Sequence, residues 1–263
     1  MQPLTLSLVQ TTTCWHDPAA NRALFDEWLA QVPDGVQLVV LPEMFSTGFT
    51  MASHEVAEPM SGPTVEWLRR RAVEYGRTLC GSTVIEEDGR CFNRFLWVTP
   101  DGEVASYDKR HRFRMAGEHE HYAAGSERRV MRLGGWRILP LVCYDLRFPV
   151  WLRNRGDYDL LLAVANWPAA RQRAWNALLR ARAIENLAYA AGVNVVGEDG
   201  NGIEYTGGSA VYDPEGAALL EAGREPCLCT LTLDGDALED YRRRFPAGQD
   251  ADDFELVRAP EQQ

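Results

Sequence analysis

Lysine is almost absent from this chain. The sequence has 27 basic residues, and all of them except Lys109 are arginine. Where arginine replaces lysine so consistently, a retained lysine indicates a position that needs a compact ammonium with rotatable donors. The alternative is chance retention at a surface position, so Lys109 is a candidate functional residue and no more at this point.

Other absences exclude whole classes of protein. No apolar run approaches the roughly 18 residues of a membrane span, and residues 1–6 lack the basic and apolar pattern of a signal peptide. We therefore expect a cytoplasmic protein without a membrane partner. The net charge of -11 repels phosphate backbones, so we expect no nucleic-acid partner. No glycine-rich loop follows the first predicted strand, which disfavours a nucleotide-binding fold, and we expect no cofactor.

The cysteines show no metal-binding or redox spacing. None of the six belongs to a C-x-x-C pair, and in a cytoplasmic chain of 263 residues they are interpreted as free thiols, mostly small core residues. They are Cys14, Cys80, Cys91, Cys143, Cys227 and Cys229.

Strand and helix patterns alternate along the chain without a linker. Apolar alternation and turn signals predict strands at 4–8, 37–41, 78–86, 90–98, 103–108, 130–133, 136–142, 160–165, 192–197, 209–212 and 227–233. Helical spacing predicts helices at 21–31, 64–75, 171–191 and 235–245, and another beginning near Pro149. We therefore expect one α/β domain over residues 1–263, with mixed sheets and a polar tail from about residue 247.

Three reactive side chains each follow an apolar strand. Glu43 comes after the strand at 37–41, Lys109 after 103–108 and Cys143 after 136–142. Because α/β sheets present their working groups at the carboxyl ends of strands, we expect the three to meet at one edge. Taken alone, Cys143 is more simply a core thiol and Glu43 a helix cap. Their combination with the one lysine favours a catalytic site.

Each of the three has a plausible chemical role. Amides at the start of the helix near Pro149 would lower the pKa of the Cys143 thiol and favour the thiolate. No histidine accompanies Cys143 in its segment, so Glu43 is the better candidate base. Lys109 and the backbone N–H of Tyr144 could stabilise an oxyanion. Asp145 and Arg147 are expected to pair with each other or with neighbours and brace the turn.

These segments resemble the three signature segments of the nitrilase (carbon–nitrogen hydrolase) superfamily. They are Leu-Pro-Glu-Met-Phe at 41–45, Tyr-Asp-Lys-Arg-His at 107–111 and Val-Cys-Tyr-Asp-Leu-Arg-Phe at 142–148. Within the superfamily the chain is most similar to bacterial omega-amidases, through residues 107–113, 165–168 and 244–247. The resemblance implies a four-layer α-β-β-α sandwich that pairs into a homodimer or a higher assembly.

The resemblance also implies the catalytic groups. It assigns a Glu43–Lys109–Cys143 triad that forms a cysteine acyl-enzyme, with the Tyr144 amide at the oxyanion. A second glutamate is expected in the loop after the lysine, and Glu118 fits its spacing better than Glu120.

The resemblance further implies the substrate, a short 2-oxo dicarboxylic monoamide such as 2-oxoglutaramate or 2-oxosuccinamate. With Lys109 committed to the oxyanion, the substrate carboxylate needs an arginine. The candidate is Arg171, with Arg173 and Arg112 as alternatives. The residues expected to line the substrate are Phe45, Phe49, Asn166 and Trp167.

Rival interpretations remain open. A metal-dependent hydrolase would use His111, His119 and His121, but their spacing is not that of known zinc motifs, so we expect no metal. A binding protein with a vestigial triad, or a nitrilase or amidase with another substrate, are further alternatives.

Overall fold

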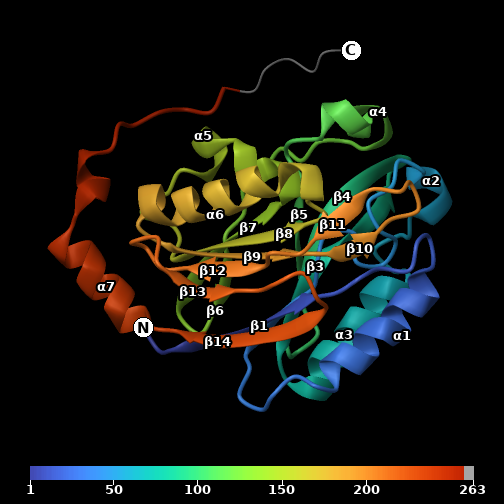
Figure 1. Cartoon of the computed structure of the whole chain (residues 1–263), viewed down its shortest axis with the longest axis horizontal. Coiled ribbons are helices and arrows are strands. Elements are labelled where there is room, and N and C mark those ends of the chain that lie inside the picture. Colours follow the sequence, from blue (N-terminus) through green and yellow to red (C-terminus); the bar gives the residue numbers. More distant parts are fainter. Residues whose placement is uncertain (258–263) are drawn as a thin grey trace.

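Two six-stranded sheets form the centre of the molecule (Figure 1). The structure is a computed structural model and describes residues 1–257. The strands are β1 (Leu4–Gln10), β2 (Leu38–Val40), β3 (Thr78–Glu87), β4 (Arg90–Val98), β5 (Val104–Asp108), β6 (Met131–Leu133), β7 (Trp136–Val142), β8 (Leu160–Ala165), β9 (Tyr189–Asn194), β10 (Val196–Glu198), β11 (Glu204–Thr206), β12 (Ala210–Tyr212), β13 (Ala218–Glu221) and β14 (Cys227–Leu233). The strand order is β14-β1-β2-β3-β4-β5 in the first sheet and β13-β12-β9-β8-β7-β6 in the second, and β10 and β11 form a separate pair.

Helices cover the outer face of each sheet. Two helices, α1 (Pro18–Leu29) and α3 (Pro63–Tyr75), pack on the first sheet, and α6 (Gln172–Asn186) lies on the second (Figure 1). The shorter helices are α2 (Ser53–Val56), α4 (Glu118–His121), α5 (Pro149–Leu152) and α7 (Gly235–Arg244), and the 3-10 turns are η1 (Arg114–Ala116), η2 (Cys143–Arg147), η3 (Ala169–Arg171) and η4 (Ala247–Asp250). This architecture confirms the expected α-β-β-α sandwich.

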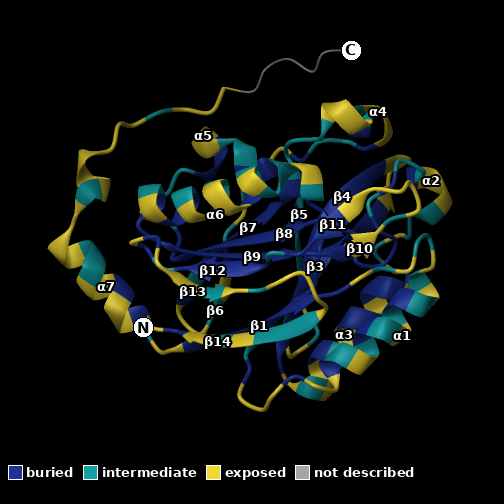
Figure 2. Cartoon of the chain, viewed as in Figure 1, coloured by how far each residue is buried: buried dark blue, intermediate teal, exposed yellow. Residues whose placement is uncertain are grey.

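Both sheets are mixed, as predicted. The strands β1, β2 and β3 pair in parallel in one sheet, as β7, β8 and β9 do in the other. Parallel neighbours need long crossovers, which α1, α3 and α6 provide. All of β8 is buried because it is covered on both faces, so its sequence is a continuous apolar run. The buried residues fill the space between the sheets, and the outward helix faces are exposed (Figure 2).

The sequence prediction is wrong at helix and strand boundaries. The strand expected at 192–197 covers only the end of β9 and the start of β10. The helix expected at 171–191 ends at Asn186, and β9 begins at Tyr189. Leu187 ends the helix in the left-handed conformation, with φ 49° and without the usual glycine. The residues that follow are all apolar or small, so apolar spacing gave no sign of the boundary. Near Pro149 the helix α5 has only 4 residues.

The ends of the chain carry less structure. The predicted tail begins at η4, and residues 251–257 have no regular secondary structure, while the rest of it, 258–263, lies outside the described residues. Within residues 1–257, no helix combines the length and the apolar character that a membrane crossing needs.

Candidate active site

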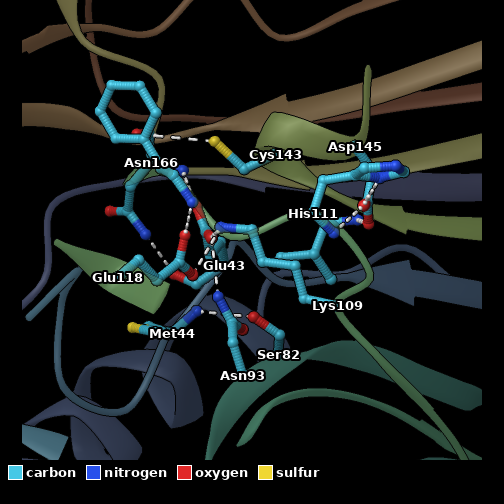
Figure 3. Close-up of polar contacts among 12 residues, drawn as sticks. Glu43, Met44, Ser82, Asn93, Lys109, His111, Glu118, Cys143, Asp145 and Asn166 are labelled. Carbon is cyan, nitrogen blue, oxygen red and sulfur yellow. Dashed lines mark hydrogen bonds and ion pairs between the residues drawn. The ribbon is translucent and has the colours of Figure 1, made fainter. Parts of the chain in front are cut away.

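The three strand ends singled out in the sequence meet between the two sheets. Glu43 follows β2, Lys109 follows β5 and Cys143 opens η2 directly after β7. Figure 3 shows their side chains converging on one point, with Glu118 and Asn166 beside them. All three side chains are buried, and Cys143 retains 9% exposure toward a cavity.

Glu43 is held by three donors. Its Oε1 accepts hydrogen bonds from Lys109 Nζ at 2.9 Å and from Asn93 Nδ2 at 2.8 Å. Its Oε2 accepts from the backbone N–H of Asn166 at 2.8 Å. The carboxylate is 0% exposed, and these three hydrogen bonds fix its orientation.

Asn93 was missed by sequence reasoning. It sits in β4, whose residues are otherwise mostly apolar or aromatic, and it is 1% exposed. A buried amide in such a strand needs a hydrogen-bond partner, and this is the signal that could have marked it. Here its partner is Glu43.

Lys109 lies between two carboxylates. Its Nζ donates to Glu118 Oε1 at 2.8 Å as well as to Glu43. Burial alone would lower the pKa of Lys109, but the charges of Glu118 and Glu43 outweigh it and raise the pKa. The two carboxylates therefore favour the charged form of the lysine.

The second glutamate of the cluster is Glu118, and not Glu120. Glu118 is 0% exposed, and its other oxygen accepts the backbone N–H of Phe113. Burial raises the pKa of Glu118, against the opposing effect of Lys109. Glu120 is exposed and lies beside His119.

Gly125 ties the Glu118 loop back to the lysine. Its N–H donates to the Lys109 carbonyl at 2.9 Å. A Cβ at this position would lie 2.0 Å from the carbonyl oxygen of Asp108, so no larger residue fits.

Cys143 has a strained backbone and a protonated thiol. Its φ is 46°, in the left-handed region that residues with a side chain rarely adopt. Burial raises the pKa of the thiol well above its ordinary value, and Glu43 adds to this effect while Lys109 opposes it. The sequence had predicted that helix amides near Pro149 lower the pKa of this thiol, and that prediction is wrong. α5 is too short to supply a strong helix dipole, and the neighbouring carboxylate disfavours a second negative charge. A reaction at this sulfur would therefore need a base to remove the thiol proton.

Asn166 closes the site on the side of β8. The Cys143 Sγ points to the Asn166 carbonyl oxygen at 3.9 Å. The Asn166 side chain donates to the Glu43 backbone oxygen at 2.6 Å. Asn166 lines the cavity as expected, but its amide is already engaged in bracing Glu43.

The cavity above Cys143 is small, and its surface is mostly apolar. Its volume is about 40 Å³, and its wall consists of Phe49, Lys109, Phe113, Cys143, Tyr144, Arg147, Asn166, Trp167, Pro168 and Arg171. A larger cavity of about 420 Å³ lies between α5 and the tail, with no catalytic group in its wall. The smaller one is the candidate substrate site, because Cys143 and Lys109 are part of its wall.

Phe45 does not line this cavity, contrary to expectation. Its ring is 0% exposed and lies 5.4 Å from the Phe25 ring and 6.0 Å from the Trp67 ring, in the core under α1 and α3. The chain turns at Met44, with φ 41°, and the Phe45 N–H then bonds the Ser82 carbonyl, which directs the ring away from the site.

Asp145 and Arg147 do not pair with each other. Asp145 accepts from Tyr107 Oη and Val142 N–H, and it bonds both the backbone and the ring of His111 (Figure 3). Its carboxylate therefore links the Lys109 segment to the Cys143 turn. Arg147 instead lies over the Trp167 ring, facing the cavity.

The remaining candidates are distributed around the site. Arg171 lines the cavity, Arg112 donates to the Tyr122 carbonyl, and Arg173 is exposed. His111 is engaged with Asp145. Across residues 1–257 no group of three His, Cys, Asp or Glu side chains lies close enough together to hold a metal ion.

Known proteins resemble this chain along nearly its whole length. The sequence profile of the family described as carbon-nitrogen hydrolase matches residues 5–243. A Yersinia enterocolitica protein named omega-amidase YafV is 50% identical over 259 residues, which cover 98% of this chain and 100% of that protein. A 2-oxoglutaramate amidase of Bacillus subtilis is 30% identical, over 94% of this chain and 96% of that protein. A solved structure of a CN-hydrolase superfamily protein from Xanthomonas campestris, with an arsenic adduct in its active site, is 49% identical, with TM-score 0.96 over 98% of this chain and 100% of that one.

Proposed function

This chain belongs to the carbon–nitrogen hydrolase family and hydrolyses amides, and we propose that its substrates are the terminal amides of short 2-oxo dicarboxylic acids. The products are ammonia and a dicarboxylate, and 2-oxoglutaramate and 2-oxosuccinamate are the expected substrates. The names of the relatives support this substrate class. The observation that carries the proposal is the contact of Lys109 with Glu43, beside Cys143 on the wall of a small cavity.

In the first half-reaction Cys143 is the nucleophile. Its Sγ attacks the amide carbon while Glu43 takes the thiol proton, because burial keeps that thiol protonated at rest. Lys109 and the backbone N–H of Tyr144 stabilise the oxyanion. The C–N bond then breaks, Glu43 returns the proton to the departing ammonia, and a thioester on Cys143 remains.

In the second half-reaction a water molecule replaces the amine. Glu43 takes a proton from the water, the resulting hydroxide attacks the thioester, and the proton returns to the Cys143 sulfur as the dicarboxylate leaves. Glu118 holds Lys109 in position throughout. In this scheme each proton transfer passes through Glu43.

Arg171 is the proposed partner of the substrate carboxylate. It lines the cavity at its rim, where its guanidinium carbon lies 5.1 Å from the Phe113 ring centre. A planar guanidinium binds a carboxylate through two parallel hydrogen bonds. Phe49 and Trp167 lie on the same wall and would contact the aliphatic part of a short substrate.

A substrate series tests this assignment. Ammonia release from 2-oxoglutaramate and succinamate is expected to exceed that from neutral amides of equal length. Arg171→Ala should lower kcat/KM for the acids on the order of 10- to 100-fold, since a hydrogen bond to a charged group is lost, and leave neutral amides nearly unchanged. Arg173→Ala is the matched control, because Arg173 is exposed at the start of the adjoining helix. If the unmodified enzyme prefers neutral amides or nitriles, the substrate assignment fails while the triad stands.

We also propose a cytoplasmic homodimer. The six cysteines are all free in the structure, as in a reducing compartment.

The dimer is proposed to form through α5 and α6. Val150 on α5 and Ile184 on α6 are large apolar side chains that are 55% and 47% exposed. Sedimentation at micromolar concentration should give the mass of a dimer or of an assembly of dimers, and a monomer there contradicts the proposal.

A further inference from the structure

Two of the six cysteines form a pair on an edge strand. Cys227 and Cys229 lie on β14, which ends the first sheet and has β1 as its one neighbour there (Figure 1). Because side chains two residues apart on a strand point to the same face, the two thiols lie together, with 3.3 Å between their Sγ atoms. No other two cysteine sulfurs in the described part of the chain lie within hydrogen-bonding distance of each other. The proposed reaction uses neither thiol.

A small reagent can reach this pair. Both residues are partly exposed. Leu228, between them, points to the other face of β14 and packs against the core under α1 and α3. Pairing with β1 holds the backbone of both cysteines. The strand therefore presents two thiols side by side in a fixed arrangement.

The distance between the sulfurs selects the kind of atom that can bind both. An atom bonded to each sulfur at about 2.3 Å, the usual length of a metal–thiolate bond, would hold them at an angle of about 90°. Trivalent arsenic has such an angle, because it is pyramidal and forms three bonds. A linear two-coordinate ion such as Cu(I) would need the sulfurs about 4.6 Å apart, twice that bond length. A tetrahedral Zn²⁺ would need further ligands, and residues 1–257 contain no group of three His, Cys, Asp or Glu side chains that could hold a metal ion.

The protonation of the pair favours the same ligand. Burial raises the pKa of Cys229 to about 12, and the contact with Cys227 adds to this effect. The thiol therefore keeps its proton near neutral pH, and a partner must remove it. An arsenic(III) oxide does so, because its oxygen leaves with the thiol protons as water. A disulfide is disfavoured, since thiol–disulfide exchange needs a thiolate and Cα atoms two residues apart on a strand are about 6.8 Å apart, at the upper limit for a disulfide.

We propose that Cys227 and Cys229 form a binding site for trivalent arsenicals that carry one organic group. With phenylarsine oxide, each sulfur forms one bond to arsenic, the arsenic–oxygen bond breaks, and the oxygen leaves with both thiol protons as one water molecule. Arsenic stays trivalent, so the step needs no oxidant or reductant. The single thiol of Cys143 can form only one such bond, so the pair on β14 holds the arsenic more tightly. The inference is independent of the proposed function.

The experiment measures how firmly each form of the protein holds phenylarsine oxide. The native wild-type protein is saturated with the reagent and titrated with 2-mercaptoethanol, a monothiol, and intact-protein mass spectrometry counts the arsenic that remains. Because the second bond of a chelate forms within one molecule, Cys227→Ser and Cys229→Ser should each release the arsenic at a 2-mercaptoethanol concentration on the order of 10²- to 10⁴-fold lower. Cys14→Ser, which removes an exposed thiol outside the pair, is the matched control and should leave that concentration unchanged.

Peptide mapping of the wild-type adduct gives a second measurement that needs no substitution. It should place the arsenic on the peptide that contains Cys227 and Cys229, and Cys143→Ala should keep this adduct. Arsenic that maps to Cys143 alone, or that is lost in Cys143→Ala, would overturn the inference. The same conclusion would follow if 2-mercaptoethanol removed the arsenic from the wild type as readily as from the serine variants, or if the wild-type pair were found as a disulfide that takes up no arsenic.

Discussion

Replacing Cys143 with alanine is expected to abolish ammonia release from every amide substrate. Removing the nucleophile of a hydrolase costs on the order of 10⁶-fold in kcat. The change deletes one sulfur atom at a site bordering a cavity, and alanine meets the same strained φ of 46° as cysteine, so the fold should persist. Ammonia release and thermal unfolding, measured on the same preparation, test both parts of the expectation.

The matched control for this variant is Cys14→Ala. Cys14 is an exposed free thiol outside the cavity wall, and its replacement should leave turnover unchanged. Mass spectrometry after incubation with an amide should find an acyl adduct on the wild type and on Cys14→Ala, and none on Cys143→Ala. Normal turnover in Cys143→Ala would refute the acyl-enzyme. Inactivation of the wild type by a chelator would instead favour a metal-dependent hydrolase.

Part of the convergence of the three reactive groups could be predicted from strand direction. Glu43 follows β2 in the first sheet and Cys143 follows β7 in the second, and each of these strands pairs in parallel with a neighbour, so each side chain lies at a carboxyl end where α/β folds place working groups. The expected single sheet edge is wrong, because the three side chains meet between two sheets. Lys109 follows β5, an antiparallel strand at the edge of the first sheet, so strand direction did not predict its place. It was a candidate functional residue because the chain has no other lysine. The Asp88-Gly89 turn joins β3 and β4, and both residues have the positive φ that a two-residue hairpin turn requires and that Asp-Gly pairs favour.

What could not be predicted depends on side-chain direction and on burial. The strained Met44 turns Phe45 into the core, and no sequence period encodes such a turn. The pKa of Cys143 depends on how completely the fold encloses the thiol and its carboxylate neighbour, which only the tertiary structure shows. Arg147 stands two residues after Asp145, so their spacing allowed an ion pair between them. In the structure the Asp145 carboxylate instead bonds the His111 ring and the Tyr107 hydroxyl.

Glu43→Gln is expected to lower kcat on the order of 10²- to 10⁴-fold, the usual contribution of a general base. Glutamine has nearly the same shape, and its carbonyl can still accept from Lys109 and Asn93. Its amide group then faces the Asn166 N–H, a donor against a donor, so a modest loss of thermal stability should accompany the loss of rate. Glu120→Gln, an exposed carboxylate on α4, is the control and should change neither.

The pH dependence of Glu43→Gln separates a base from a merely structural residue. If Glu43 takes the thiol proton during attack, as we propose, turnover near neutral pH does not require a preformed thiolate. Without this base only the thiolate reacts, and burial holds the pKa of Cys143 above its ordinary value even after the carboxylate charge is removed. The residual kcat should therefore rise about tenfold per pH unit on the acid side of that pKa, because the thiolate fraction rises in that proportion. A variant that loses rate but keeps the wild-type pH profile would show that Glu43 only supports Lys109, and that another group carries the proton.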